Sequence, residues 1–304
     1  MGWDVVATVR APRPYVQRFV DRYRQLGAST IHIFHDDPDF ACALAGDDLV
    51  QTVCDAAYWG DRRPRPVEMR QTHNATLAAG RSSAEWLLHC DVDEHICAAR
   101  DVGEVLAEVP AACACLIALP LEAVYDRRPR SVDEIFATPY FKTTAAGWAA
   151  SRAFWQEVNG DLHRFSAAGF WGHRVGKSFI RLSGLPPGQP MPIHMPSGEA
   201  FRLMNPARSA DLRLLHFDAL LPAEWLRKHT DRATGRVRTR WLGEKRTLFA
   251  RFVHDTLEAG GEPAALELYD RLFVLHKPVL DRAIAGGLVA HLREARSESP
   301  DTRP

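Results

Sequence analysis

The sequence lacks the features that mark membrane-spanning and secreted proteins. Its 304 residues contain no apolar run of about 18 residues or more, so no membrane-spanning helix is expected. The first residues, MGWDVVATVRAPRP, lack the apolar segment of a signal peptide. The six cysteines are scattered without a C-x-x-C pair, which favours reduced, mostly buried thiols in a cytoplasmic protein.

An excess of charge of either sign is also missing. Lys+Arg and Asp+Glu both total 38, so the net charge is zero and no nucleic-acid partner is expected. Without a membrane span, any membrane contact would be peripheral. The motifs G-x-S-x-G, Walker A and G-x-G-x-x-G are absent, which leaves hydrolase, P-loop and dinucleotide-binding interpretations without their usual anchor.

The N-terminal segment has the pattern of a strand–helix–strand unit. Residues 4–10, DVVATVR, form a β-branched apolar run without helical period, which predicts a buried strand. The next stretch, RPYVQRFVDRYRQLGA, has apolar residues at helical spacing, with Pro14 near its start and Gly27 just after its end. A second strand is predicted over 29–37, STIHIFHDD. The two strands should be parallel because a helix connects them.

This alternation continues along the chain. A helix is predicted over 67–84, a third strand over 85–92, a short helix over 101–109 and a fourth strand over 114–125. The pattern predicts an α/β fold with a mostly parallel sheet flanked by helices, followed by a C-terminal helical extension. We expect a core over residues 1–215, a helical region over 216–295 and a disordered tail over 296–304.

Acidic residues end two of the first three predicted strands. Asp36 and Asp37 close the second strand, and Asp91, Asp93 and Glu94 follow the apolar part of the third. The carboxyl ends of parallel neighbours meet at one edge of a sheet, where α/β proteins bind ligands. Clustered carboxylates repel one another unless something positive lies among them. The sequence therefore predicts a site for Mg²⁺ or Mn²⁺, which commonly bridge a protein carboxylate and substrate phosphates.

These segments resemble the GT-A glycosyltransferases, in particular the family 2-like and family 92-like group, whose members carry a W-x-x-x-x-D-x-D-E-F stretch. The match here is Trp86, Asp91, Asp93 and Glu94. The LG-x-x-x-I-x-I-F-x-D-D pattern around the second strand also fits. The segments GKSFIR, PIHMP and LLHF to WLRKH follow in the family's order, so the resemblance covers most of residues 4–230.

The resemblance implies a metal-dependent hexosyltransferase-type enzyme that moves a sugar from a nucleotide donor, expected to be a UDP-sugar, to a saccharide or other hydroxyl acceptor. Its family-level setting is bacterial surface or exopolysaccharide synthesis. Mn²⁺ or Mg²⁺ would be held by Asp93 and Asp91, with His216 or His194 as a further ligand. Thr8, Arg10 and Asp36 would contact the nucleoside of the donor. Lys177 and Arg181 would contact a phosphate or the acceptor.

Two departures from the family pattern keep other interpretations open. VRAPRP stands where the family has K-N-E after the first strand, and His95 replaces the aromatic or apolar residue after D-x-D-E. A nucleotidyltransferase, or a non-catalytic relative that binds a nucleotide or sugar, is therefore an alternative. A continued strand would instead place His89, Asp91, Asp93 and His95 on one face as a transition-metal site. The acids could also simply be solvated at a strand end.

The catalytic base is not identified by the sequence. An inverting enzyme needs a carboxylate near the acceptor hydroxyl. The candidates that the sequence offers, without choosing among them, are Glu122, Asp126, Glu157, Asp161 and Glu199.

Overall fold

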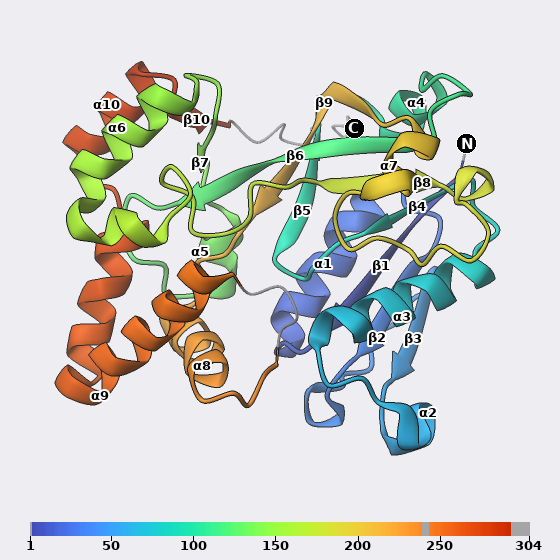
Figure 1. Cartoon of the computed structure of the whole chain (residues 1–304), viewed down its shortest axis with the longest axis horizontal. Coiled ribbons are helices and arrows are strands. Elements are labelled where there is room, and N and C mark those ends of the chain that lie inside the picture. Colours follow the sequence, from blue (N-terminus) through green and yellow to red (C-terminus); the bar gives the residue numbers. More distant parts are fainter. Residues whose placement is uncertain (1, 239–242, 293–304) are drawn as a thin grey trace, which may run out of the picture.

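The computed structural model describes residues 2–238 and 243–292, which form a mixed α/β structure around a ten-stranded sheet (Figure 1). The main order of strands is β10-β7-β6-β8-β4-β1-β2-β3, and β9 joins β5 to β6 beside this path. The predicted α/β class is confirmed, as is the C-terminal helical extension.

The N-terminal half of the sheet is parallel. β1 (Trp3–Val9) pairs with β2 (Ile31–His35) on one side and with β4 (Trp86–His89) on the other, and β3 (Leu49–Val53) extends the edge beyond β2. The helix α1 (Arg13–Gln25) connects β1 to β2, which confirms the predicted strand–helix–strand unit.

Alternating side chains of β1 bury the two faces of this half-sheet. Val5 packs in one apolar cluster with Phe19 of α1, whereas Val6 packs in a second cluster with Ala75 and Ala78 of α3 (Val67–Arg81). Successive strand residues point to opposite faces, so α1 and α3 cover opposite sides of the sheet. All seven residues of β1 are buried, as expected for a central strand.

The other half of the sheet mixes directions. β8 (Lys177–Arg181) lies antiparallel between β4 and β6 (Cys115–Val124), and β7 (Tyr140–Lys142) and β10 (Val289–His291) extend the far edge. β5 (Glu94–Ala98) pairs antiparallel with β9 (Ala207–His216), which brings Glu94 opposite His216. The turn that carries the acids therefore lies next to the end of β9.

The remaining helices divide into those before and those after β9. Before it lie α2 (Ala56–Trp59), α4 (Val102–Ala107), α5 (Val132–Phe136), α6 (Trp148–Asn159) and α7 (Gly198–Met204), with 3₁₀ turns η1 (Pro38–Phe40), η2 (Gly60–Arg62), η3 (Gly160–Phe165) and η4 (Leu182–Gly184). The C-terminal helices are α8 (Pro222–Ala233), α9 (Glu244–Phe273) and α10 (Lys277–Ala285). α9 is broken at Gly261, whose φ of 66° lies outside the helical region.

The predicted core and C-terminal region share their apolar packing. One cluster contains Phe19 of α1 together with Trp225 of α8 and Tyr269 of α9. β10 lies inside the region predicted as helical, so that region is not helical throughout. The division at residue 215 stays a prediction, and the predicted tail, 296–304, lies outside the described residues.

All six cysteines are free. None of the described helices is both long and apolar enough to cross a membrane.

Candidate functional site

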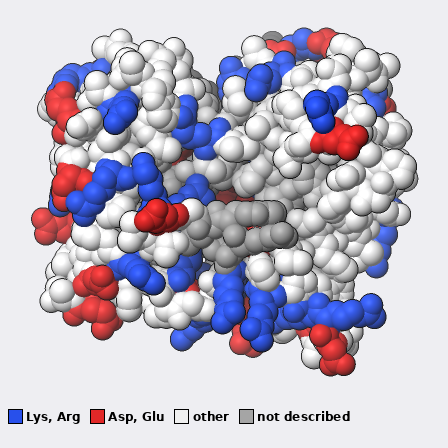
Figure 2. Space-filling model, viewed as in Figure 1, with Lys and Arg blue, Asp and Glu red and all other residues white. Residues whose placement is uncertain are grey.

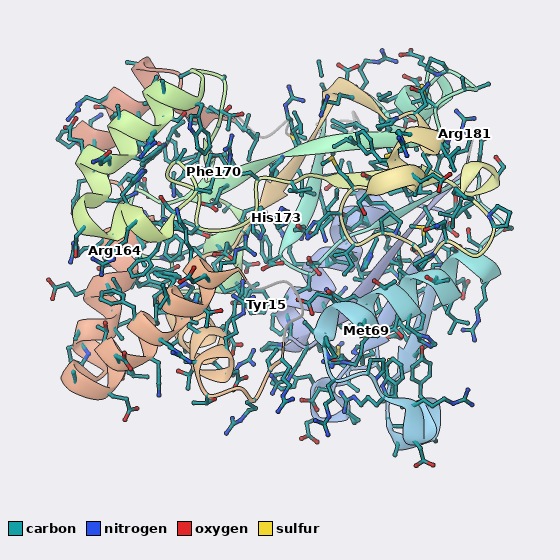
Figure 3. The ribbon with its side chains drawn as sticks, viewed as in Figure 1. Tyr15, Met69, Arg164, Phe170, His173 and Arg181 are labelled. Atoms are coloured by element: carbon teal, nitrogen blue, oxygen red, sulfur yellow. The ribbon has the colours of Figure 1, made fainter. Side chains whose placement is uncertain are left out.

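A cavity of about 490 Å³ opens where the carboxyl ends of β1, β2 and β4 face α8 and the start of α9. Its walls also include α3, the turn between β4 and β5, and residues 171–175. Figure 3 shows His173, one of the lining residues, between the two halves of the molecule. The position agrees with the rule that open α/β sheets bind ligands at the carboxyl ends of their strands.

The turn between β4 and β5 is held together from inside. Glu94 is fully buried, and its Oε2 accepts a hydrogen bond from the Asp91 N–H at 2.8 Å. Lys177 of β8, also fully buried, places its Nζ 2.8 Å from Asp91 Oδ2 and 3.0 Å from Glu94 Oε2. A fixed cation therefore lies between two of the three acids, which explains how they are tolerated directly after a buried strand.

The pKa values of the acids of this turn are shifted in different directions. Burial opposes the charge on Asp91 and on Glu94, but Lys177 and the neighbouring histidines together outweigh it, so the pKa of each carboxyl group lies below its ordinary value. For Asp93, burial outweighs the nearby Lys228 and His216, so its pKa is raised. Asp93 is thus the carboxyl group whose charged form would gain most from an additional cation.

Asp93, His216 and Asp218 form a group of three buried side chains whose ligand atoms all lie within 4.8 Å of one another. His216 is the last residue of β9, and Asp218 follows two residues later. Lys228 of α8 places its Nζ 2.8 Å from Asp218 Oδ1 and 3.6 Å from Asp93 Oδ2. Two carboxylates and one imidazole can hold Mn²⁺, or Mg²⁺ with additional oxygen ligands.

A second group shares His216 with Glu94 and His173, again within 4.8 Å. The Nε2 of His173 lies 2.6 Å from Glu94 Oε1, and its ring stacks on that of His216 at 4.8 Å. His194, the other histidine predicted as a metal ligand, lines the cavity and meets the His173 ring edge-on at 4.3 Å. Burial lowers the pKa of His194 to about 3. Of the two predicted histidines, His216 is the one that lies beside Asp93.

Asp91, predicted as a second metal ligand, belongs to neither group of potential ligands among the described residues. Its Oδ1 accepts a hydrogen bond from the Gln71 side chain, and its Oδ2 accepts one from Lys177. Both oxygens are therefore engaged in this structure, and the role of Asp91 as a metal ligand stays a prediction. Asp218, which the sequence reasoning missed, lies beside Asp93 instead. The His-x-Asp spacing of residues 216 and 218 was the available signal.

The predicted nucleoside-facing residues Thr8, Arg10 and Asp36 all line the cavity. Asp36 accepts hydrogen bonds from Nε and Nη2 of Arg70 in α3, at 2.6 and 2.7 Å. Thr8 Oγ1 accepts one from Asn74 at 3.0 Å. Arg70, which also lines the cavity, was not predicted from the sequence. The role of these residues toward a nucleoside stays a prediction.

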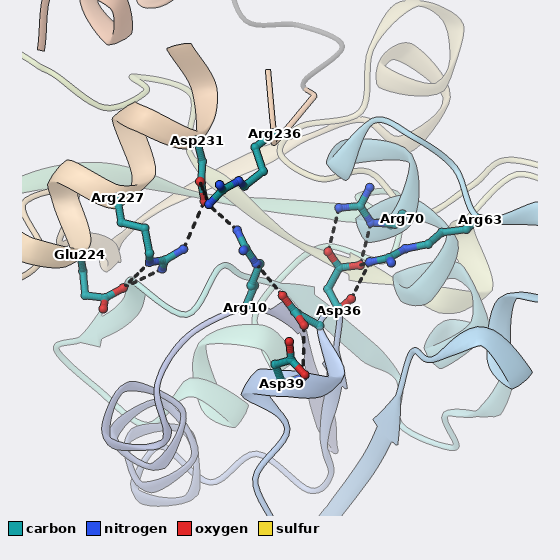
Figure 4. Close-up of polar contacts among 10 residues, drawn as sticks. Arg10, Asp36, Asp39, Arg63, Arg70, Glu224, Arg227, Asp231 and Arg236 are labelled. Atoms are coloured by element: carbon teal, nitrogen blue, oxygen red, sulfur yellow. Dashed lines mark hydrogen bonds and ion pairs between the residues drawn. The ribbon is translucent and has the colours of Figure 1, made fainter. Parts of the chain in front are cut away.

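Arg10 connects the two sides of the cavity mouth. Its Nε lies 2.9 Å from Asp37 Oδ2, directly after β2, and its Nη1 lies 2.9 Å from Asp231 Oδ2 in α8 (Figure 4). Arg227 and Arg236 also lie within 3.5 Å of Asp231. The end of β1 is therefore tied to α8 through side chains that are far apart in the sequence.

Lys177 and Arg181 lie at opposite ends of β8, and neither is among the residues that line the cavity. Lys177 pairs with Asp91 and Glu94 inside the protein. Arg181 pairs with Glu85, donates to the Val109 carbonyl at 2.9 Å and lies 4.4 Å over the Trp86 ring. Residues 177 and 181 are four positions apart on β8, which corresponds to about 13 Å along the strand. Figure 3 accordingly shows Arg181 well away from His173. The phosphate or acceptor contacts of Lys177 and Arg181 stay a prediction.

None of the carboxylates considered as a catalytic base lies among the described residues of the cavity wall. Glu122 is buried, pairs with Lys142 and accepts hydrogen bonds from the N–H groups of residues 171 and 172. Glu157 and Asp161 form exposed ion pairs with arginines. The remaining two are Asp126, in a separate hollow, and the exposed Glu199.

The alternative transition-metal site is not assembled. β4 ends at His89 and β5 begins at Glu94, so a turn interrupts the alternation. His89 contacts the Pro192 carbonyl through Nδ1 at 3.2 Å, whereas His95 stacks on Phe136 at 4.6 Å. The two histidines therefore have separate environments.

Comparison with known proteins leaves the family of the chain undetermined. No family model matches the chain, and no curated protein matches it. Similar solved structures include CMP:2-keto-3-deoxy-manno-octonic acid synthetase complexed with CTP (15% identity, covering 46% of this chain and 57% of that chain, TM-score 0.28). S. aureus TarS 1–349 in complex with UDP has 12% identity, 95% and 88% coverage and a TM-score of 0.34. GalNAc-T7 with UDP, GalNAc and Mn²⁺ has 10% identity, 95% and 58% coverage and a TM-score of 0.35.

The chain spans little more than half the length of the first and third of these proteins. Identities of 10–15% with TM-scores of 0.28–0.35 are too low to decide a function.

Proposed function

We propose that this protein is a metal-dependent glycosyltransferase that moves a sugar from a nucleoside-diphosphate donor to a hydroxyl acceptor. The observation that carries the proposal is the group formed by Asp93, His216 and Asp218 at the carboxyl edge of the parallel half-sheet. This group lies inside a cavity of about 490 Å³, a volume within the usual range for small-molecule sites.

The charges around the cavity support a diphosphate ligand together with a divalent cation. The described lining residues include seven carboxylates and six lysine or arginine side chains, and Lys177 lies directly behind the wall. The fixed charges therefore balance, and a bound divalent cation would leave a positive surplus. A diphosphate diester offsets a surplus of this size, which fits a nucleotide-sugar better than an uncharged sugar.

The residues of the wall have distinct parts in this proposal. Asp93, His216 and Asp218 would hold Mn²⁺ or Mg²⁺, which when bound supplies positive charge to phosphate oxygens. Lys228 stabilises the ionised form of Asp218: burial alone would raise the pKa of Asp218, but Lys228 and His216 bring it well below its ordinary value. Arg232 and Arg246 also line the cavity and can stabilise the charge that develops on a departing nucleoside diphosphate.

The nucleoside would lie at the β1–β2 end of the cavity. Thr8, Arg10 and Asp36 line that end, and Arg70 holds the Asp36 carboxylate through two hydrogen bonds. Trp171 and Phe249 stack at 5.5 Å with an interplanar angle of 18° on the other side, and both line the cavity. Aromatic faces of this kind pack against sugars and exclude water, so we place the acceptor there.

The finer parts of the proposal rest on the resemblance of the D-x-D-E segment. They are a UDP-sugar as the donor, a hexose as the transferred group and a saccharide acceptor in bacterial surface or exopolysaccharide synthesis. A cytoplasmic location with peripheral membrane contact belongs to the same expectation. A nucleotidyltransferase would instead consume a nucleoside triphosphate and release pyrophosphate, so the reaction products distinguish the two activities.

A thermal-shift panel tests the proposed donor site. UDP, GDP, CDP and dTDP are each added with and without Mn²⁺ to the wild type, to Asp93→Asn and to Asp47→Asn, an exposed acid outside the cavity. A ligand that binds only the folded state raises the melting temperature. We expect one nucleotide to raise it in a Mn²⁺-dependent way in the wild type and in Asp47→Asn but not in Asp93→Asn. No shift with any nucleotide in the wild type would contradict the proposal.

A further inference from the structure

A second hollow of about 580 Å³ opens beside the main cavity, at the ends of β1 and β2. Its charged side chains come from four separate parts of the sequence: Arg10, Asp36, Asp37, Arg63, Arg65, Arg70, Arg236 and Arg238. We call these eight residues the arginine groove. The chain as a whole has no net charge, so the excess of six arginines over two aspartates is local. Figure 2 shows basic side chains gathered at the lower centre of this face.

Ion pairs within the groove do not neutralise it. Asp36 is shared by Arg70, at 2.6 Å, and Arg63, at 3.5 Å, so one carboxylate serves two guanidinium groups (Figure 4). Asp37 pairs with Arg10, and Asp231, which lies outside the groove, pairs with Arg10 and Arg236, so three carboxylates face six arginines. Arg65 and Arg238 are exposed and have no ion-pair or hydrogen-bond partner for their side chains among residues 2–238 and 243–292.

The hollow is lined by guanidinium groups whose N–H donors are only partly used within the protein. Each guanidinium carries five N–H donors in a planar fork that matches the oxygens of a phosphate group. The side chain of Arg70 is only 11% exposed, and it donates to Asp36 and to the carbonyls of Pro64 and Arg65, so it contributes fixed positive charge more than free donors. The side chain of Arg63 is 48% exposed. The groove thus combines a rigid inner arginine with accessible outer ones, which lowers the entropy cost of binding an anion.

We propose that the arginine groove binds a phosphate group, carried either by a soluble phosphorylated compound or by a phospholipid headgroup. The groove shares Arg10, Asp36 and Arg70 with the main cavity but contains none of the three residues proposed to hold the metal. The bound phosphate is therefore distinct from the donor diphosphate beside Asp93. The inference goes beyond the proposed transfer reaction and does not depend on it.

Calorimetric titration with inorganic pyrophosphate, in EDTA and at low salt, tests the groove without the metal site. The double variant Arg65→Gln/Arg238→Gln removes two charges without breaking a described ion pair. Arg62→Gln is the matched control, because Arg62 is exposed in η2 and lies outside the groove. We expect about fivefold weaker binding for the double variant, the order expected for two lost charged contacts, and no change for the control.

The source of the phosphate is tested by sedimentation with phosphatidylcholine vesicles that contain or lack phosphatidylglycerol. Binding only to the anionic vesicles, lost in the double variant, identifies a headgroup. Pyrophosphate binding without vesicle binding identifies a soluble compound. The proposal is overturned if the wild type binds neither probe, if the double variant binds both as the wild type does, or if Arg62→Gln weakens binding equally. Mn²⁺-dependent nucleotide binding, measured separately, should not change in the double variant, so failure of the two proposals can be told apart.

Discussion

Replacing Lys177 with methionine removes the cation that lies between Asp91 and Glu94 and keeps an unbranched side chain of similar length. The Nζ lies 2.8 Å from one carboxylate and 3.0 Å from the other, and the side chains of Lys177 and Glu94 are fully buried. Removing one partner of a buried ion pair leaves an uncompensated charge and costs about 3–5 kcal/mol. That is a large part of the free energy of unfolding of a typical domain, about 5–15 kcal/mol.

Urea denaturation followed by circular dichroism at pH 7.5 measures this cost. Lys277→Met is the matched control, since the Lys277 side chain is 84% exposed and pairs with Asp281 on the surface of α10. Exposed pairs contribute about 0–1 kcal/mol, so the control should change little. Lys177→Met combined with Glu94→Gln removes one of the two facing charges and should recover part of the loss. Equal and small losses for Lys177→Met and Lys277→Met would refute the internal-counterion reasoning.

Three further predictions follow from particular contacts. A Cβ at residue 172 would lie 2.3 Å from the His216 ring, so Gly172→Ala should weaken Mn²⁺ binding about tenfold, as measured by calorimetry. Gly80→Ala is the control and should leave Mn²⁺ binding unchanged, because the space around Gly80 is open. Burial opposes the charge on Asp4, but the nearby His32, 3.5 Å away, and the hydrogen bond that Ser82 donates outweigh it and lower its pKa. The stabilisation is therefore present above the ordinary pKa and lost as the pH falls through the lowered one. Asp4→Asn should cost about 1–3 kcal/mol at pH 7 and progressively less below pH 4, as urea unfolding would show; a cost independent of pH would contradict this. Arg181→Gln should leave nucleotide affinity unchanged, because Arg181 lies outside the cavity wall. A tenfold loss of affinity would contradict this and would support a contact between Arg181 and the nucleotide.

The N-terminal strand–helix–strand unit could be predicted because its signals are local. Tyr15, Phe19 and Tyr23 of α1 are buried at helical spacing, and all residues of β1 and β2 are buried. The position of β8 could not be predicted in this way. Its pairing with β4 joins residues that are more than 90 positions apart, such as Trp86 and Arg181, and no short pattern encodes such a contact.

The candidate site could likewise be predicted only where its signals are local in the sequence. The acids at the strand ends could be located from the alternation of strands and helices, because parallel strands bring their carboxyl ends together. The partner that neutralises them, Lys177, lies 86 residues after Asp91, and its role depends on the insertion of β8. Asp218 and Lys228 likewise reach Asp93 through the pairing of β9 with β5 and the packing of α8. The sequence therefore indicated where a site would lie but not which side chains would complete it.

The central claim is that Asp93, His216 and Asp218 together hold the divalent cation of a nucleotide-sugar site. Crystals grown with Mn²⁺ and the nucleotide selected by the thermal-shift panel, measured at the manganese absorption edge, test this most directly. We expect an anomalous peak in contact with the Asp93 carboxylate, the His216 imidazole and the Asp218 carboxylate, with a phosphate oxygen of the nucleotide beside it. A peak held by Glu94, His173 and His216 instead, or a nucleotide bound with no metal beside Asp93, would contradict it.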